Sequence, residues 1–552
     1  MTSIPYGSYV ISGLRHGYSR TSMGGLIEPI LGTRKIRSPS FLSLTGPAVP
    51  LLTATVFVVL VLGALSTAAG SVIGLINFRD VGYPDSANLS RVGDFVQSGR
   101  MYPDFHRPPY QLAVYPPLTY VLHAIPYALG EQIGLSHQAS VRLGVLAAFV
   151  LCLTLLFWIG RVTTSSHVGG WLAVLFGAAI FPLGDWTTQI RSEFWAIAFS
   201  LAAVLIVIRS PGRQSLIAAA ILAGMAPAVK QTFVAAPGAV FIWLLVSRSF
   251  KNAVIWSAAV CVTLLVGFGI AWAREPSMLE HLSALTDSAI DYREAFRFLM
   301  WALSQPMIPF AALGVVLALS TRRKEVLLLS TFCTLSWLIA AATILHAGGN
   351  INYFWEPLLA SSILAAFALR EIDGRGGLPR AASTLLALVF LWACASIVAN
   401  DLRYLRDSFQ NVASYEERRR RWSSFTSVIA GHRILSIEPS LTVLSSAPQV
   451  PDPYLNTILE LAGKWSYAPI IAQLDASQFD LVVVNRGYPE RELSYRGVPL
   501  WSAGVRIALN ATYRRGCVFE DFEIWLPSRD SGTLLARLSD VGCSKREGDS
   551  DP

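Results

Sequence analysis

Apolar runs of nearly membrane-spanning length recur between Leu51 and Val398 and then stop. A helix that crosses a bilayer needs about 20 mainly apolar residues, so each run predicts a span. Nine runs predict single helices: 51–76, 141–160, 169–184, 194–208, 253–273, 298–320, 326–345, 353–369 and 382–398. A tenth run, 216–246, is too long for one span and is divided at Lys230, which predicts a tight hairpin. The pattern indicates an α-helical polytopic membrane protein with about eleven spans.

A shorter apolar segment, 115–130, contains Pro116, Pro117 and Pro126. If it does not cross, the basic residues that flank the spans share one side with the basic N-terminus, as cytoplasmic positive charge requires. These residues are Arg161, Arg209, Arg213, Arg248, Lys251, Arg322, Arg323, Lys324, Arg370, Arg375 and Arg380. Segment 115–130 is therefore expected to be a helix on the outer membrane face, inside a large first outer loop, 77–140.

The composition differs on either side of the predicted membrane domain, 49–400. Residues 1–48 are polar, rich in Gly and Ser, and basic, which predicts a disordered cytoplasmic arm. Residues 401–552 have the composition of a soluble domain. They begin with SYEERRRRWSSF, a charged helical linker, and continue with the strand-like runs RILSIEPS, LTVLSS, FDLVVVNRG and CVFEDFEIWLP. We expect a small extracytoplasmic α/β domain, where Cys517 and Cys543 could pair.

The overall composition supports this interpretation. Hydrophobic residues make up 53% of the 552 residues and charged residues 14%, against roughly a quarter charged in soluble proteins. The net charge of +8 is distributed in short clusters between apolar runs, which is typical of orientation signals and not of a nucleic-acid surface. The bilayer is thus the expected partner, and no nucleic acid is expected.

Polar side chains that could carry chemistry collect on the predicted outer side. Asp80 and Asp85 follow the first span, although Asp85 could equally cap the helix that begins there. Lys230 lies at an outer turn against the orientation bias, and its alternative is a snorkelling lysine. Arg142 begins the second span.

Arg191 and Glu193 occur together in TQIRSEF and could simply form a pair within a turn. Carboxylates and cations in one place suit the transfer of a group from a lipid phosphate to a hydroxyl. A carboxylate takes the proton of the acceptor, and Arg or Lys compensates the charge on the departing phosphate. His106, His123 and His346 lack metal-ligand spacing, so no metal site is expected.

Four short motifs resemble the GT-C superfamily of integral membrane glycosyltransferases, which use polyprenyl-phosphate sugars. They are an Asp after the first span followed by a helix and SGRMY, then YPPL, then a run ending in VKQT, then NYFWEPLL at the start of a late span. Bacterial relatives include the aminoarabinose and protein O-mannosyl transferases. The resemblance implies a bacterial cytoplasmic membrane protein.

The resemblance also implies roles for individual residues. The proposed base is Asp85, with Asp80 as second choice, and the family often has two adjacent acids where this chain has Asp85-Ser86. Donor-phosphate binding is implied for Arg142, Lys230 and Arg191. Glu193, Tyr115, Asn352 and Tyr353 are expected to line the donor or acceptor pocket. For Asn352 and Tyr353, helix capping and an interfacial aromatic are the alternatives.

These features predict an inverting glycosyltransferase. It would move a sugar from a polyprenyl-phosphate donor to a lipid, glycan or protein acceptor on the outer face, without a cofactor. A lipid or solute transporter is the main alternative, and a non-catalytic scaffold on the same fold is the second. A transporter would show symmetric halves or broken helices at corresponding positions.

Overall fold

The structure is a computed structural model that describes most of the predicted membrane domain and the C-terminal domain. The described residues are 48–78, 85–180, 183–210, 212–285, 290–346, 349–374, 403, 406, 414–442, 452–487, 494–495, 498–529 and 532–544. All of them belong to the unit Thr45–Pro552. Asp80, the predicted arm up to residue 47, and the predicted span 382–398 lie outside the described residues.

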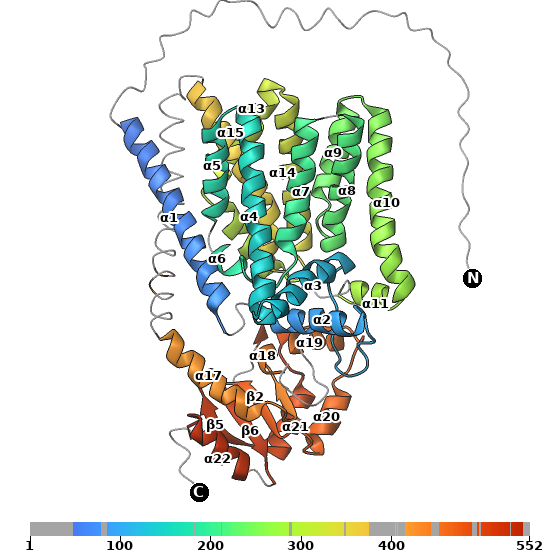
Figure 1. Cartoon of the computed structure of the whole chain (residues 1–552), viewed down its shortest axis with the longest axis vertical. Helices are drawn as coiled ribbons and strands as arrows, with labels where there is room; N and C mark the ends of the chain where they lie inside the picture. The colour runs from blue at the N-terminus through green and yellow to red at the C-terminus, as the bar shows by residue number, and fades with distance from the viewer. Residues whose placement is uncertain are drawn as a thin grey trace, which may run out of the picture. The chain divides into compact units, whose positions relative to one another are not determined.

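Apolar helices packed side by side form the membrane domain (Figure 1). They are α1 (Ala48–Ile76), α4 (His137–Thr164), α5 (His167–Ala178), α7 (Glu193–Arg209), α8 (Arg213–Val229), α9 (Ala235–Val246), α10 (Phe250–Arg274), α13 (Ile308–Thr321), α14 (Lys324–Thr343) and α15 (Trp355–Gly374). One apolar core runs through the bundle. Large apolar side chains such as Leu65, Val254 and Leu265 remain exposed, which suits contact with lipid rather than water.

The helices follow the predicted runs with two corrections. The expected single helix over 169–184 was wrong, because α5 ends at Ala178 and a separate short helix, α6 (Leu183–Trp186), follows it. In the described ranges, four helices are long and apolar enough to cross a membrane, or five if the bent pair α12 (Tyr292–Leu303) and α13 is one span. The expected single helix over 298–320 was wrong, because α12 and α13 meet at 74°. Pro306 and Pro309 lie at this break, and proline cannot donate the backbone hydrogen bond that a continuous helix needs. The hairpin at Lys230 is confirmed as α8 and α9.

Two helices of the first loop run across the ends of the bundle helices (Figure 1). They are α2 (Asp85–Ser98) and α3 (Pro117–Gln132), and the short α11 (Met278–Ser283) lies near them. Helix α3 exposes Val121, Ile125 and Leu129, which share one helix face because they are four residues apart. An exposed apolar stripe of this kind supports the expectation that α3 lies in the membrane interface.

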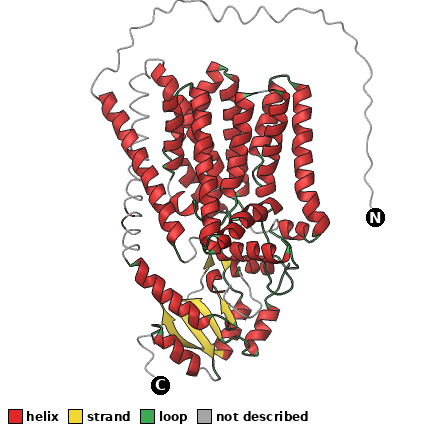
Figure 2. Ribbon diagram, in the orientation of Figure 1, coloured by secondary structure: helices red, strands yellow, loops and turns green. Residues whose placement is uncertain are grey.

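The C-terminal domain is a small mixed sheet between helices (Figure 2). Strands β1 (Ile434–Ser436), β2 (Leu481–Asn485), β6 (Phe522–Pro527) and β5 (Tyr513–Phe519) are hydrogen-bonded in that order. Only the β1–β2 pair is parallel within this sheet. A two-stranded ribbon, β3 (Ser494–Tyr495) and β4 (Val498–Pro499), lies apart from it. The domain is therefore α/β, as the sequence predicts.

Alternation along β2 fills a core on each face of the sheet. Val482 and Val484 pack with α19 (Pro453–Leu461), α20 (Ala468–Asp475) and α21 (Ala503–Thr512). Leu481 and Val483 pack with α17 (Tyr415–Ile429) and α22 (Gly532–Asp540). The predicted linker helix is thus part of the domain core. The expected strand LTVLSS is wrong over its first two residues, which end helix α18 (Pro439–Thr442).

A disulfide and contacts with the first loop stabilise the C-terminal domain. Cys517 and Cys543 form a disulfide with Cα atoms 5.6 Å apart. Side chains of the first loop, including Tyr110, complete the core on one sheet face. The Asn456 side chain also donates a hydrogen bond of 3.0 Å to the Tyr110 carbonyl. The C-terminal domain therefore packs directly against the loop that follows α1.

Candidate functional site

Asp85 and Arg142 form a buried ion pair. Asp85 is the first residue of α2 and Arg142 lies in the second turn of α4. Their Oδ2 and Nη2 atoms are 3.3 Å apart, and the side chains are 1% and 0% exposed. The Arg142 Nη1 also donates to the carbonyls of Gly74 and Asn77, at the end of α1. The pair therefore fastens α2 to the ends of α1 and α4.

Glu193, Lys230 and Asn352 meet in a second buried cluster. Glu193 begins α7, Lys230 forms the turn after α8, and Asn352 lies in η1 (Ile351–Phe354) before α15. The Lys230 Nζ is 2.7 Å from the Glu193 Oε1, and the two side chains are 7% and 2% exposed. The Asn352 side-chain amide donates to the same oxygen. Three segments far apart in the sequence thus converge on one carboxylate.

Aromatic side chains and a second cation adjoin this cluster. The Lys230 ammonium lies 4.5 Å from the centre of the Tyr353 ring. The Arg191 guanidinium stacks on Trp186 at 4.9 Å and donates through Nε to the Gln189 side chain. Burial raises the pKa of the Tyr115 hydroxyl, and the nearby Glu193 carboxylate raises it further. Arg191 and Tyr115 are therefore at the same end of the bundle as the Glu193 cluster.

Backbone contacts connect the two clusters and hold α3 over them. The Asp85 Oδ1 accepts a hydrogen bond of 2.8 Å from the Ile190 N–H, three residues before Glu193. The Thr119 hydroxyl of α3 donates to the Val229 carbonyl, the residue before Lys230, over 2.5 Å. Asp85 is thus positioned against the segment that carries Arg191 and Glu193. The predicted residues form two adjacent sites, with Arg142 beside Asp85 and Lys230 beside Glu193.

Two oxygen atoms of the Glu193 cluster have unused hydrogen-bonding capacity. Within the described part of the chain, the buried Glu193 Oε2 and Asn352 Oδ1 have no hydrogen-bond partner. Buried polar atoms in native structures are almost always paired, so exceptions need a reason. Free acceptors next to two cations could receive the hydroxyl groups of a sugar while the cations attract a phosphate.

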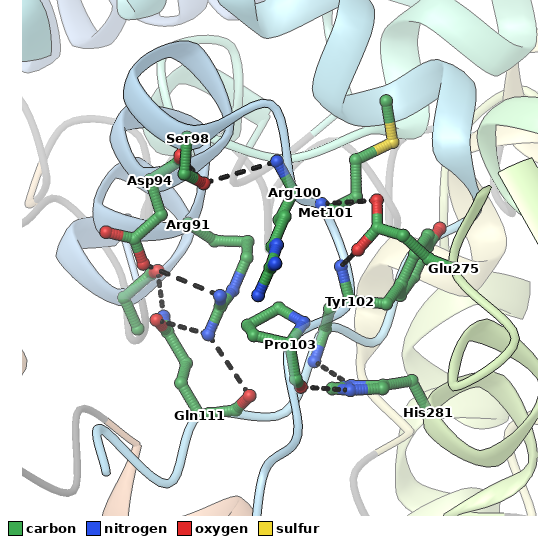
Figure 3. Close-up of polar contacts among 12 residues, drawn as sticks. Arg91, Asp94, Ser98, Arg100, Met101, Tyr102, Pro103, Gln111, Glu275 and His281 are labelled. Carbon is green, nitrogen blue, oxygen red and sulfur yellow. Dashed lines mark hydrogen bonds and ion pairs between the residues drawn. The ribbon is translucent and has the colours of Figure 1, made fainter. Parts of the chain in front are cut away.

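The SGRMY motif is anchored by contacts that the sequence pattern did not indicate (Figure 3). Glu275, just after α10, accepts the backbone N–H groups of Met101 and Tyr102, over 2.8 and 2.6 Å. On the other side of the loop, the buried Arg91 donates to the carbonyl and the side chain of Gln111. These contacts shape the loop that leads into YPPL.

His281 of α11 completes the loop anchor with a defined tautomer (Figure 3). Its Nδ1 accepts the Ala113 N–H over 2.9 Å, so the proton is on Nε2, 2.7 Å from the Pro103 carbonyl. Protonation of Nδ1 would direct a second donor at the Ala113 N–H. Burial lowers the pKa of His281 to about 4. The histidine is therefore a neutral structural clamp, which its isolated position in the sequence did not reveal.

Glu356 is a further buried acid that the sequence interpretation passed over. It lies in the first turn of α15, four residues after Asn352, and is 5% exposed. Ser200 of α7 and Ser336 of α14 lie against its carboxyl group. A carboxylate inside an apolar run is itself a functional signal, and the motif NYFWEPLL contained it. No three His, Cys, Asp or Glu side chains among the described residues lie close enough to hold a metal ion.

Comparison with solved structures identifies the fold. ArnT from Cupriavidus metallidurans bound to undecaprenyl phosphate matches with a TM-score of 0.52 and 14% identity, over 87% of this chain and 97% of that chain. The apo structure of ArnT matches with a TM-score of 0.53 and 15% identity, over 87% and 98%. No protein-family model and no curated protein matches the sequence. This chain therefore has the fold of ArnT, which agrees with the family that the sequence resemblance predicted.

Proposed function

We propose that this protein is an inverting membrane glycosyltransferase that uses a polyprenyl-phosphate-linked sugar. Its acceptor is a lipid, glycan or protein at the outer face of the cytoplasmic membrane, and the C-terminal domain lies on that side. The observation that carries the proposal is the convergence of Glu193, Lys230 and Asn352, next to the Asp85–Arg142 pair, at one end of an ArnT-like bundle. The ArnT structure bound to undecaprenyl phosphate supports the class of donor.

Asp85 is the proposed general base, with Asp80 as second choice. An acceptor hydroxyl attacks C1 of the sugar as Asp85 takes its proton. The C1–oxygen bond to phosphate breaks with its electron pair on oxygen, so polyprenyl phosphate leaves with an added negative charge. Attack from the face opposite the phosphate inverts C1. Asp85 is oriented for this step by the Ile190 N–H on one oxygen and by Arg142 on the other.

Lys230 and Arg191 are the proposed cations for the departing phosphate. Lys230 is held by Glu193 and faces Tyr353, and Arg191 is held by Trp186. Fixed cations stabilise growing charge without reorganising during the reaction. Arg142 already contacts Asp85 and two backbone carbonyls. We therefore propose that it orients the base and does not contact the phosphate. Glu193, Asn352, Tyr353 and Tyr115 would surround the sugar.

The test measures release of polyprenyl phosphate from a panel of lipid-linked sugars by purified wild type, Asp85→Asn and Asp80→Asn. We expect Asp85→Asn to lose at least a hundredfold in turnover while it still binds the donor, because a missing general base removes about that factor or more. Glu131→Gln, an exposed carboxylate of the same loop, is the control and should keep full turnover.

Other outcomes separate the proposals. Loss in Asp80→Asn alone would move the base to Asp80. Full turnover in both variants would exclude Asp85 and Asp80 as the base. A wild type that binds none of the donors, but moves a lipid or solute across vesicles, would replace the transferase by a transporter.

A further inference from the structure

A second charged pocket lies at the end of the bundle opposite the candidate site. It has a volume of about 420 Å³ and is lined by Trp158, Arg161, Val162, Ser165, Ser166, His167 and Arg209. Arg161 lies in the last turn of α4 and Arg209 ends α7. The same two helices carry Arg142 and Glu193 near their starts. A volume in the range of small-ligand sites, about 300–1,000 Å³, is large enough for a phosphate with its substituents.

Both arginines are organised by one indole ring. The Arg161 and Arg209 guanidinium carbons lie 5.0 and 5.4 Å from the centre of the Trp158 ring. Within the described ranges, neither guanidinium has a carboxylate or a hydrogen-bond acceptor as partner. Stacking on an indole leaves the N–H edges of a guanidinium available, and those edges match the oxygen atoms of a phosphate. An anion bound between the two guanidinium groups would offset their mutual repulsion.

The turn between α4 and α5 adds donors on a rigid frame. Ser165 ends α4 with a left-handed backbone, and Ser166 caps α5, whose N-terminus carries partial positive charge. The helices approach so closely that a Cβ atom on Gly169 would lie 1.9 Å from the Thr164 hydroxyl. The pocket is therefore built by close packing and does not depend on a loose surface loop.

The position of the pocket along the helices indicates a membrane surface. Arg161 follows Arg142 by nineteen positions on α4, which at 1.5 Å per residue is about 28 Å. This is close to the roughly 30 Å thickness of the hydrocarbon layer. Val168 and Trp171, on the first turns of α5, are exposed beside the pocket. Exposed apolar side chains next to paired cations suit a ligand with acyl chains below an anionic headgroup.

We propose that this pocket binds the phosphate of an anionic phospholipid headgroup, at the membrane surface remote from the candidate site. The arginines hold the phosphate oxygens, Ser165, Ser166 and His167 contact the headgroup, and the acyl chains lie along α5. Free phosphate presents the same chemistry to the arginines, and the experiment separates the two sources.

The test uses the purified full chain in detergent, with phosphatidylglycerol, phosphatidylcholine or inorganic phosphate added. Retained lipid is counted by native mass spectrometry, and binding is followed by the shift in thermal unfolding. We expect phosphatidylglycerol to bind at least tenfold more tightly than phosphatidylcholine. The double variant Arg161→Gln/Arg209→Gln should lose that preference. Arg213→Gln/Arg322→Gln removes the same charge from exposed positions at helix ends and should retain it.

Each remaining outcome decides the proposal. An equal loss in the control variant would assign the preference to general positive charge and overturn the pocket. Binding of inorganic phosphate that requires both arginines, without preference for phosphatidylglycerol, would support the phosphate site and exclude lipid as its source. If the pocket variant does not fold, photoreactive phosphatidylglycerol added to the wild type should label peptides of α4 and α5. Labelling elsewhere only would overturn the proposal.

Discussion

Replacing Lys230 by methionine would leave the Glu193 carboxylate in a buried place without its counter-ion. The two groups are 2.7 Å apart and almost fully buried, so water cannot take over the role of the ammonium. Methionine has a similar length and flexibility, so the packing of the side-chain stem changes little. The expected loss of folding stability is therefore electrostatic and arises from the unpaired Glu193 carboxylate.

The loss of folding stability has an upper limit, because the unpaired Glu193 carboxylate can bind a proton and become neutral. Holding that proton at pH 7 costs about 3.7 kcal/mol, since glutamate in an unfolded chain has a pKa of about 4.3. At pH 5 the same cost is about 1.1 kcal/mol, because the unfolded chain then also binds part of the proton. The loss of stability in Lys230→Met should thus be large at pH 7 and shrink toward pH 5.

The assay is reversible or scan-controlled thermal unfolding in detergent for wild type, Lys230→Met, Glu193→Gln and the double variant, at pH 7 and pH 5. The double variant has no charge at positions 193 and 230 and keeps a hydrogen-bond acceptor for Asn352. It should unfold close to the wild type and above both single variants at pH 7. A double variant as unstable as Lys230→Met, or a deficit that does not change with pH, would refute the reasoning.

Three further predictions concern His281, the disulfide of the C-terminal domain and Glu275. His281 has a pKa of about 4 instead of about 6.5, so it supplies stability that is complete above pH 6.5 and is lost as the pH falls to 4, up to about 3 kcal/mol. Burial also lowers the pKa of His123 to about 4, so His123 loses stability over the same pH range. The variant His281→Gln should therefore show roughly half of the wild-type fall in unfolding temperature between pH 7 and pH 4.5. An unchanged fall in unfolding temperature would contradict this. Breaking the Cys517–Cys543 disulfide should destabilise the C-terminal domain by about 3.5 kcal/mol for a loop of 26 residues, measured by unfolding with and without reductant, and equal midpoints would exclude the bond. Glu275→Ala should raise amide exchange at residues 101–102 at least tenfold, because the carboxylate accepts both N–H groups, whereas Glu275→Gln keeps an acceptor and should raise it less.

Local patterns predicted most elements correctly, and the exceptions have local causes. The apolar runs predicted the bundle helices, the lysine in a long run predicted the α8–α9 hairpin, and the continuous apolar run of FDLVVVNRG predicted β2. The break between α12 and α13 was missed, although Pro306 and Pro309 lay within that run. The beginning of LTVLSS was misassigned because a short β-branched run is ambiguous without its partners.

The site was predictable as a set of residues but not as an arrangement. Charges retained near apolar helix ends selected Asp85, Arg142, Glu193 and Lys230, since each needs compensation near a membrane. The sequence could not say that Arg142 pairs with Asp85, 57 positions away, or that Lys230 pairs with Glu193, 37 positions away. It also did not single out Glu275 or His281, which act through backbone groups of another segment.

The sequence by itself determined that this chain is a membrane-embedded helical bundle with an α/β tail, and which polar residues had to be explained. Hydrophobic periodicity and charge placement are properties of each segment, so they indicate which residues become buried without knowledge of the tertiary contacts. Which carboxylate meets which cation was decided only when segments far apart in the sequence packed together. Ion pairs and hydrogen bonds act over a few ångströms, so their partners depend on tertiary packing and not on proximity along the chain.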